Sequence, residues 1–182
     1  RQTPPRTIGL ITVSSSCRRV GPVAGQHFRA ALSDNFRIAL PEIVTRTVSA
    51  DGTRKYLVRI AGGHEVETVY IPEEDRGTLC ISSQVGCALD CAFCATGAQG
   101  FNRNLSTAEI IGQVWQAAAE LGDEHQLTNV VMMGMGEPLA NYKNLIGALT
   151  VITDNGYGLR FASRRVTVST AGLLPRLADL GR

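Results

Sequence analysis

The sequence predicts an α/β protein, in which about three βα units build a parallel sheet and a small antiparallel β meander precedes them. Two observations lead to this prediction. Runs rich in β-branched residues are first joined by tight-turn dipeptides, and apolar strands later alternate with amphipathic helical segments. Residues 1–33 show neither pattern, so we expect a poorly structured segment there, with at most a short helix at 27–32. The chain is therefore divided into 1–33, a β-rich extension 34–75 and an α/β core 76–182.

The predicted meander has strands at Glu42–Ser49, Arg54–Ile60 and Glu65–Ile71. Asp51-Gly52 and Gly62-Gly63 separate these strands, and such dipeptides favour the tight turns of antiparallel hairpins.

The core is predicted to alternate strands with helices. Strands are expected at Leu79–Ser83, Asn129–Met133 and Val166–Ser169, and the second of them is apolar enough to be buried on both faces.

Each predicted core strand is followed by a helix. Ser106 and Glu109 form a capping box, which predicts a helix that ends at Gly122. Asn141 is expected to cap a second helix that ends at Asn155-Gly156, and a third runs from Gly172 to Leu180.

Three cysteines follow the first core strand with the spacing Cys87-x-x-x-Cys91-x-x-Cys94. A cubane iron–sulfur cluster has four irons, each of which normally takes a thiolate, so three thiolates leave one iron open. S-adenosylmethionine can chelate an open iron and accept an electron at its sulfonium. The spacing therefore indicates a [4Fe-4S] cluster and a radical enzyme.

Other uses of these thiols stay open. Zinc sites also use Cys-x-x-Cys, but a second pair of ligands does not follow Cys94, and a redox pair of Cys91 and Cys94 would leave Cys87 idle. Five cysteines and no secretory signal argue against a disulfide framework and for a reducing cytosol.

Charge is distributed unevenly along the 182 residues. Residues 1–60 hold ten Lys or Arg against three Asp or Glu, and residues 61–182 hold eight against thirteen. A basic amino-terminal part suits binding to a polyanion such as RNA, although ordinary surface charge explains these counts equally well. Apolar runs long enough to cross a membrane are missing from the sequence.

The run Gly134-Met-Gly136-Glu137-Pro138 follows the second core strand. Leu139 replaces the third glycine of a dinucleotide fingerprint and Pro138 blocks a normal helix entry, so we reject nicotinamide binding. Glycines would let a ligand approach the backbone, and the Glu137 carboxylate could face an ammonium group. The alternative is a plain strand-ending turn.

Several longer motifs resemble those of a known family. They are residues 65–76, Cys80-Ile-Ser-Ser-Gln-Val-Gly-Cys87, residues 100–105, 130–139 and 164–170. Across residues 34–182 the chain resembles the bacterial dual-specificity ribosomal RNA adenine-C2 methyltransferases, which are radical S-adenosylmethionine enzymes. The fold then implied is a partial radical SAM (βα) barrel.

The resemblance implies an activity and a set of roles. The family methylates C2 of an adenosine in 23S ribosomal RNA and of one beside the anticodon of certain transfer RNAs. Cys87, Cys91 and Cys94 would hold the [4Fe-4S] cluster. Gly136, Glu137 and Ser169 would contact S-adenosylmethionine. Glu67 matches a proton acceptor, and Cys80 matches a thiol that resolves the protein–RNA adduct through a disulfide.

The resemblance also implies a cellular location, an oligomeric state and an electron donor. We expect a cytoplasmic monomer that receives electrons from a flavodoxin or ferredoxin and does not enter membranes. The related C8 methyltransferases of antibiotic resistance and a non-catalytic zinc-binding RNA module are the alternatives. No cysteine follows Cys94 to match the family's methyl-carrying residue, so we expect that this chain alone cannot complete turnover.

Overall fold

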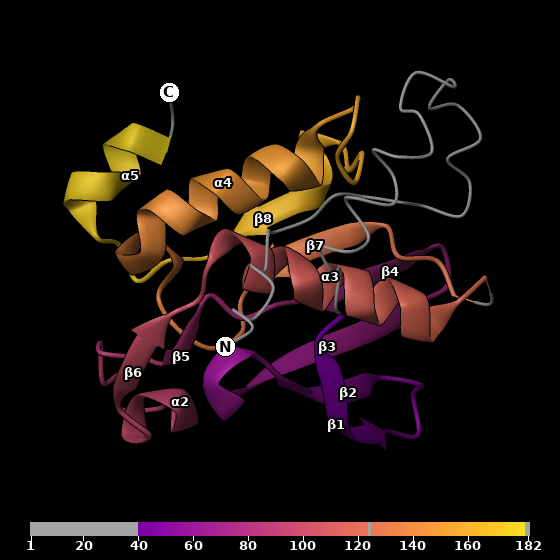
Figure 1. Cartoon of the computed structure of the whole chain (residues 1–182), viewed down its shortest axis with the longest axis horizontal. Helices are drawn as coiled ribbons and strands as arrows, with labels where there is room; N and C mark the ends of the chain where they lie inside the picture. The colour runs from indigo at the N-terminus through magenta and orange to yellow at the C-terminus, as the bar shows by residue number, and fades with distance from the viewer. Residues whose placement is uncertain (1–39, 124, 181–182) are drawn as a thin grey trace, which may run out of the picture. The chain divides into compact units, whose positions relative to one another are not determined.

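The computed structural model describes residues 40–123 and 125–180, so the predictions for 1–33 and for a helix at 27–32 lie outside the described residues. A six-stranded sheet forms the centre, in the order β1-β2-β3-β4-β7-β8 (Figure 1). Its strands are β1 (Glu42–Val48), β2 (Arg54–Arg59), β3 (Glu65–Glu73), β4 (Arg76–Cys80), β7 (Asn129–Met132) and β8 (Val166–Val168).

The predicted meander is confirmed. Strands β1, β2 and β3 pair antiparallel, and both connections contain glycines with positive φ, among them Gly52 at 83° and Gly62 at 80°. Strand β3 also pairs antiparallel with β4. The meander and the parallel strands therefore share one sheet, and the expected boundary between residues 75 and 76 falls in the β3–β4 turn.

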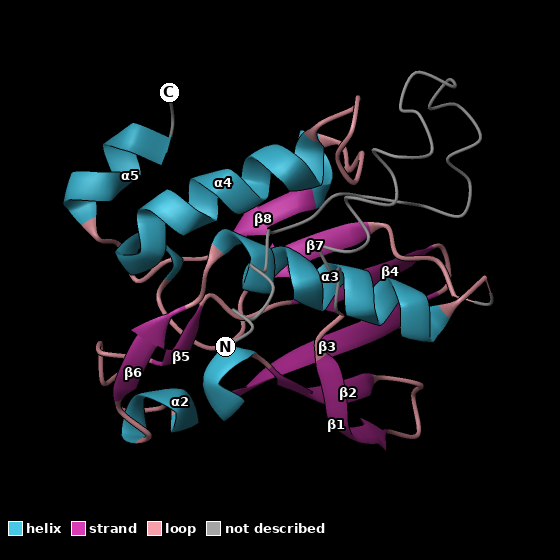
Figure 2. Ribbon diagram, in the orientation of Figure 1, coloured by secondary structure: helices cyan, strands magenta, loops and turns pink. Residues whose placement is uncertain are grey.

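The predicted βα repeats are also present. Strands β4, β7 and β8 pair in parallel. They are followed by α3 (Thr107–Leu121), α4 (Tyr142–Thr153) and α5 (Leu174–Leu180), as Figure 2 shows. Within the described residues the sheet is open and does not close into a barrel.

The first core strand differs from the prediction. Strand β4 ends at Cys80, and the chain then forms β5 (Gln84–Gly86), which pairs antiparallel with β6 (Phe101–Asn104) in a small second sheet. These strands are too short for a periodic signal. The cysteine loop consequently follows β5, and it contains the single-turn helix α2 (Ala95–Ala98).

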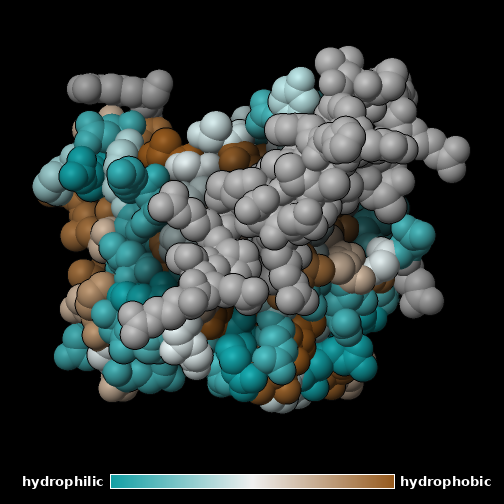
Figure 3. Space-filling model, in the orientation of Figure 1, coloured by the Kyte–Doolittle hydropathy of each residue, from teal (hydrophilic) through white to brown (hydrophobic). Residues whose placement is uncertain are grey.

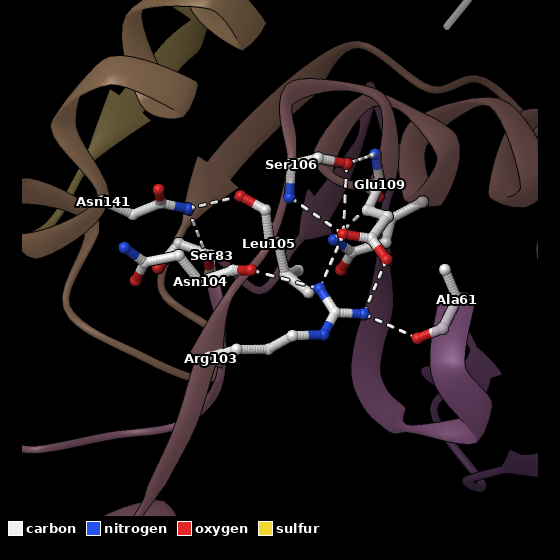
Figure 4. Close-up of polar contacts among 9 residues, drawn as sticks. Ala61, Ser83, Arg103, Asn104, Leu105, Ser106, Glu109 and Asn141 are labelled. Carbon is white, nitrogen blue, oxygen red and sulfur yellow. Dashed lines mark hydrogen bonds and ion pairs between the residues drawn. The ribbon is translucent and has the colours of Figure 1, made fainter. Parts of the chain in front are cut away.

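The start of α3 has the predicted capping box. The backbone N–H of Glu109 donates to Ser106 Oγ at 3.2 Å, and that of Ser106 donates to Glu109 Oε2 at 2.8 Å. The guanidinium of Arg103 donates two hydrogen bonds to the Glu109 carboxylate, from Nη1 at 2.9 Å and from Nη2 at 2.8 Å. Figure 4 shows that Arg103 also donates to the carbonyl of Ala61, at 2.7 Å. Helix α3 ends at Gly122, as predicted.

Asn141 occupies the N-cap position of α4, but the prediction that its side chain caps the helix is wrong. Its Nδ2 instead donates to the carbonyls of Ser83 at 2.8 Å and Leu105 at 2.7 Å (Figure 4). The side chain therefore ties the start of α4 to the segments that flank the cysteine loop.

One face of the sheet carries the core. Helices α3 and α4 lie in front of the sheet in Figure 1, and the buried Gln113 of α3 accepts from Thr68 Oγ1 of β3 at 2.9 Å. Alternation along β3 and β7 therefore turns Glu67, Val131 and Met133 toward the other face. Val131 is half-buried and Met133 is 60% exposed, so β7 is buried on one face only, contrary to prediction.

Uncovered apolar surface also lies on α5. Leu174 is 76% exposed and Leu177 is 44% exposed, and Figure 3 shows hydrophobic surface on the left of the view, where α5 lies. None of the helices in the described residues is both long and apolar enough to span a bilayer.

Candidate functional site at the carboxyl ends of the strands

The three spaced cysteines lie on one loop beside the carboxyl end of the parallel sheet. Cys87 directly follows β5, and its backbone N–H donates to the Gly100 carbonyl at 3.0 Å. Cys94 is the N-cap of α2, and its N–H donates to the Cys91 carbonyl at 2.9 Å. All three are half-buried free thiols, neither sealed in the core nor fully exposed.

Two features fix the shape of this loop. A Cβ on Gly97 would lie 3.1 Å from the Cα of Asp90, so only glycine lets α2 pack this closely against the Cys91 turn. The backbone N–H groups of Gly97 and Thr96 donate to the Cys94 sulfur and lower the pKa of its thiol. The start of α2 therefore favours the thiolate, which is the form that binds metal.

The donor set fits a cluster better than a single ion. Within the described residues, no three His, Cys, Asp or Glu side chains are grouped to hold one metal ion. In a cubane cluster each thiolate binds a different iron, so the sulfur atoms stand around a larger group than one ion. Cys87, Cys91 and Cys94 are half-buried free thiols on one loop, and this donor type suits such a cluster.

Phe93 is 94% exposed, so this aromatic side chain is not part of the core. It stands on the surface between Cys91 and Cys94.

The glycine-rich loop after β7 packs against the segment that precedes the cysteine loop. A Cβ on Gly134 would lie 2.7 Å from Ser82 Oγ, and one on Gly136 would lie 2.4 Å from Cβ of Gln84. Gly136 also has a φ of 93°. The absence of side chains at these two glycines makes room for Ser82 and Gln84. The approach of a ligand to the backbone of Gly136 stays a prediction.

The Glu137 carboxylate is buried, with 4% of the residue exposed. Its Oε1 accepts from the backbone N–H of Leu139 at 2.9 Å and from Thr170 Oγ1 at 2.6 Å, and its Oε2 accepts from the N–H of Ala171 at 2.8 Å. A carboxylate offers about four acceptor positions. One position on Oε2 therefore remains for a further donor, such as an ammonium group.

The end of β8 meets this loop as the parallel order predicts. The backbone N–H of Ser169 donates to the Met132 carbonyl at 3.3 Å, and the next residue, Thr170, reaches Glu137. Ser169 itself is half-buried. The structure thus brings the ends of β7 and β8 together.

Glu67 and Cys80 lie on the same face of the sheet, opposite the face that α3 and α4 cover; this face is called the open face below. Cys80 pairs with Val69 of β3 and Val131 of β7, and Glu67 stands two residues from Val69, which makes it a diagonal neighbour of Cys80. The ammonium of Lys55 contacts the Glu67 carboxylate. Burial raises the pKa of the Cys80 thiol, so Cys80 is less ionised than an ordinary cysteine.

Arg103 is not available for a ligand, because its guanidinium is engaged by Glu109 and Ala61. The described cysteines are all free thiols, Cys80 among them, so the disulfide that the resemblance implies for Cys80 stays a prediction.

Sequence reasoning missed the buried polar segment Ser82-Ser83-Gln84. Ser82 Oγ donates to the carbonyl of Glu67 at 2.6 Å and accepts from the N–H of Met135 at 2.9 Å, so it links the two candidate site regions. Polar residues that directly follow a buried apolar strand were the available signal, because a buried polar group needs partners.

Comparison with known proteins shows which class of protein has this site. The sequence model of the radical SAM superfamily matches residues 81–181, which is more than half of the chain. The chain belongs to the radical SAM superfamily.

Individual relatives are more specific. The chain is 60% identical over 161 residues to the dual-specificity RNA methyltransferase RlmN of Paracoccus denitrificans, covering 83% of this chain and 41% of the relative. It is 57% identical over 159 residues to the protein of the same name from Saccharophagus degradans, covering 84% of this chain and 39% of the relative. The chain thus spans about two fifths of the length of these curated relatives.

A solved structure agrees with these relatives. The crystal structure of a radical SAM methyltransferase from Sphaerobacter thermophilus superposes with a TM-score of 0.80 at 41% identity. The alignment covers 88% of this chain and 47% of that chain. The open α/β sheet is therefore part of a radical SAM fold, as predicted.

Superfamily membership implies a [4Fe-4S] cluster and S-adenosylmethionine. The residues present fit both groups. Three half-buried free thiols lie on one loop, and a buried carboxylate with one free acceptor position stands at the neighbouring strand end.

Proposed function

We propose that this chain is the cofactor-binding part of a radical S-adenosylmethionine enzyme that methylates C2 of adenine in RNA. The observation that carries the proposal is that the three-thiol loop follows β5 while the buried Glu137 follows the parallel strand β7, and that Gln84 at the start of β5 accepts a hydrogen bond from the backbone of Glu137. The RlmN names of relatives at 57% to 60% identity support the RNA substrate class.

Cys87, Cys91 and Cys94 are the proposed cluster ligands. The lowered pKa of Cys94 favours the thiolate, and the half-buried position of all three thiols supports access for iron and sulfide. When bound, the cluster supplies the electron that cleaves the sulfonium of S-adenosylmethionine reductively.

Gly136, Glu137 and Ser169 are the proposed contacts for S-adenosylmethionine. The free acceptor position on Glu137 Oε2 would accept a hydrogen bond from the ammonium of the methionine moiety. Three donors already hold the carboxylate, so it would lose little side-chain entropy on binding.

Glu67 is the proposed proton acceptor, and Cys80 is the proposed thiol that resolves the enzyme–RNA adduct by forming a disulfide with a second cysteine. C2 of adenine is neither nucleophilic nor acidic, so a carbon radical must attack it and the adduct must later lose a proton. Their shared position on the open face of the sheet supports roles at one substrate. Lys55 would keep the Glu67 carboxylate oriented.

The substrates would be 23S ribosomal RNA and certain transfer RNAs, and an external flavodoxin or ferredoxin would supply electrons to a monomeric enzyme in the cytoplasm. The basic character of residues 1–60 supports a polyanionic partner.

The experiment is anaerobic reconstitution of the 182-residue chain with iron and sulfide, followed by addition of S-adenosylmethionine and dithionite. We expect 5′-deoxyadenosine by liquid chromatography, and no C2-methyladenosine when RNA is present. A fully loaded cluster that yields no 5′-deoxyadenosine would contradict the assignment of cofactor binding. C2-methyladenosine made by this chain alone would overturn the expectation that it cannot complete turnover.

A further inference from the structure

Gln84 stands between the two halves of the proposed cofactor site. It begins β5, three residues before Cys87, and is 2% exposed. Its Oε1 accepts from the backbone N–H of Glu137 at 2.8 Å, and its Nε2 donates to Asn104 Oδ1 at 2.7 Å. Asn104 lies on β6, the strand that returns from the cysteine loop. One side chain therefore bridges the cysteine loop and the glycine-rich loop.

The backbone around Gln84 reinforces this bridge. The N–H groups of Ser83 and Gln84 both donate to the Met135 carbonyl, at 2.8 and 3.1 Å. Gly136 presents no Cβ toward Gln84, which is why the two chains approach so closely. The side-chain amide adds the one contact in this set that depends on the identity of residue 84.

We propose that Gln84 is a positioning residue that fixes Glu137 relative to the cysteine loop, so that one S-adenosylmethionine molecule can reach both. The inference rests on the proposed function. A ligand that binds a metal on one loop and a carboxylate on another loses affinity when the loops move independently. A hydrogen bond between the loops keeps the site organised before the ligand arrives.

Glutamine suits this position because it is both donor and acceptor. Methionine has a similar volume but would leave the Glu137 N–H buried without its acceptor. Gln113 of α3 provides a matched control, since it is also fully buried but bonds Thr68 and Ser82 rather than the glycine-rich loop.

The test compares wild type, Q84M and Q113M after anaerobic reconstitution. Iron content, S-adenosylmethionine affinity by equilibrium dialysis and the change in the electron paramagnetic resonance spectrum on adding the cofactor are measured for each. Q84M removes the hydrogen bonds to Glu137 and Asn104, of which only the first crosses to the glycine-rich loop. We expect Q84M to keep its iron and to bind about tenfold more weakly, as loss of that one buried inter-loop hydrogen bond predicts. Q113M should bind within about twofold of wild type, because its contacts do not cross between the loops.

Each outcome is decisive. Equal affinity of Q84M and wild type overturns the proposal, and so does an equal loss in Q84M and Q113M, which would indicate only general destabilisation. If Q84M does not fold, N104A removes the partner of Nε2 at an exposed position, and we expect about threefold weaker binding, while unchanged binding overturns the proposal. Failure of the wild type to bind S-adenosylmethionine contradicts the proposed function instead.

Discussion

Thr170 Oγ1 donates a hydrogen bond to Glu137 Oε1 at 2.6 Å, and this bond joins the ends of β7 and β8. The same hydroxyl accepts from the N–H of Gly172 at 3.0 Å. A single side chain therefore holds the buried carboxylate and shapes the turn that leads to α5.

Replacing Thr170 by valine removes both bonds while keeping the side-chain shape. We expect T170V to lower the free energy of unfolding by about 1 to 3 kcal/mol, since a hydrogen bond to a charged group is lost. Urea unfolding followed by circular dichroism measures this. Thr167 is exposed on β8, so T167V should change the value by less than about 0.5 kcal/mol, and equal effects of the two variants would contradict the assignment.

Gly136 tests the close approach of the two loops. G136A places a Cβ 2.4 Å from Cβ of Gln84 at a φ of 93°, whereas G63A adds a Cβ at a φ of 78° with no atom within 4 Å. The control isolates the cost of positive φ, which is about 1 to 2 kcal/mol. We expect G136A to lose at least about 1 kcal/mol more than G63A in urea unfolding, because of overpacking. Similar losses would show that the loops can separate at little cost.

The Arg103–Glu109 pair makes stability depend on pH. Burial alone would raise the pKa of the Glu109 carboxyl, but Arg103 and the N–H of Ser106 outweigh it and hold the pKa below its usual range. A carboxyl with a lowered pKa stabilises the fold above its unfolded pKa of about 4.3, and this contribution is lost as pH falls through the folded pKa.

E109Q should therefore be less stable than wild type by about 1 to 2 kcal/mol at pH 7. The difference should shrink as pH is lowered below about 4, over the range in which both proteins stay folded. Urea unfolding at several pH values measures it. E120Q is the control, because Glu120 contacts the half-exposed Arg46, and we expect less than about 0.5 kcal/mol there. A difference for E109Q that does not vary with pH would refute the ionic origin.

The sequence predicted those elements whose signals are local. The capping box of Ser106 and Glu109, the turn at Asp51-Gly52 and the end of α3 at Gly122 depend on residues a few positions apart, and all three are confirmed. The pair β5–β6 was missed because its register depends on residues about twenty positions apart, such as Gln84 and Asn104. The prediction for Asn141 was wrong because its side-chain amide donates to carbonyls that are distant in sequence and does not cap its own helix.

For the candidate site, too, the local features could be predicted from the sequence and the long-range contacts could not. The spacing of Cys87, Cys91 and Cys94 identified the cysteine loop as a candidate, because the three thiols are close in sequence. The partners of Glu137 could not be predicted, since Thr170 and Gln84 reach it from other segments only after the sheet has formed. The close packing of Gly134 and Gly136 against Ser82 and Gln84 could not be predicted either, because these neighbours are about fifty positions away in the sequence.

The cysteines should divide into two groups. We expect that C87A, C91A or C94A prevents assembly of the cluster, whereas C80A retains it, because Cys80 stands on β4 away from the cysteine loop. Iron and sulfide analysis after anaerobic reconstitution measures this. Equal loss of iron in C80A would refute the division.

The central claim is that three thiolates of this chain leave one iron free for S-adenosylmethionine. Mössbauer spectroscopy of the chain reconstituted with ⁵⁷Fe tests it most directly. The account predicts that one iron of the four changes its isomer shift when the cofactor is added. A cluster whose four irons give the same spectrum with and without S-adenosylmethionine would contradict it.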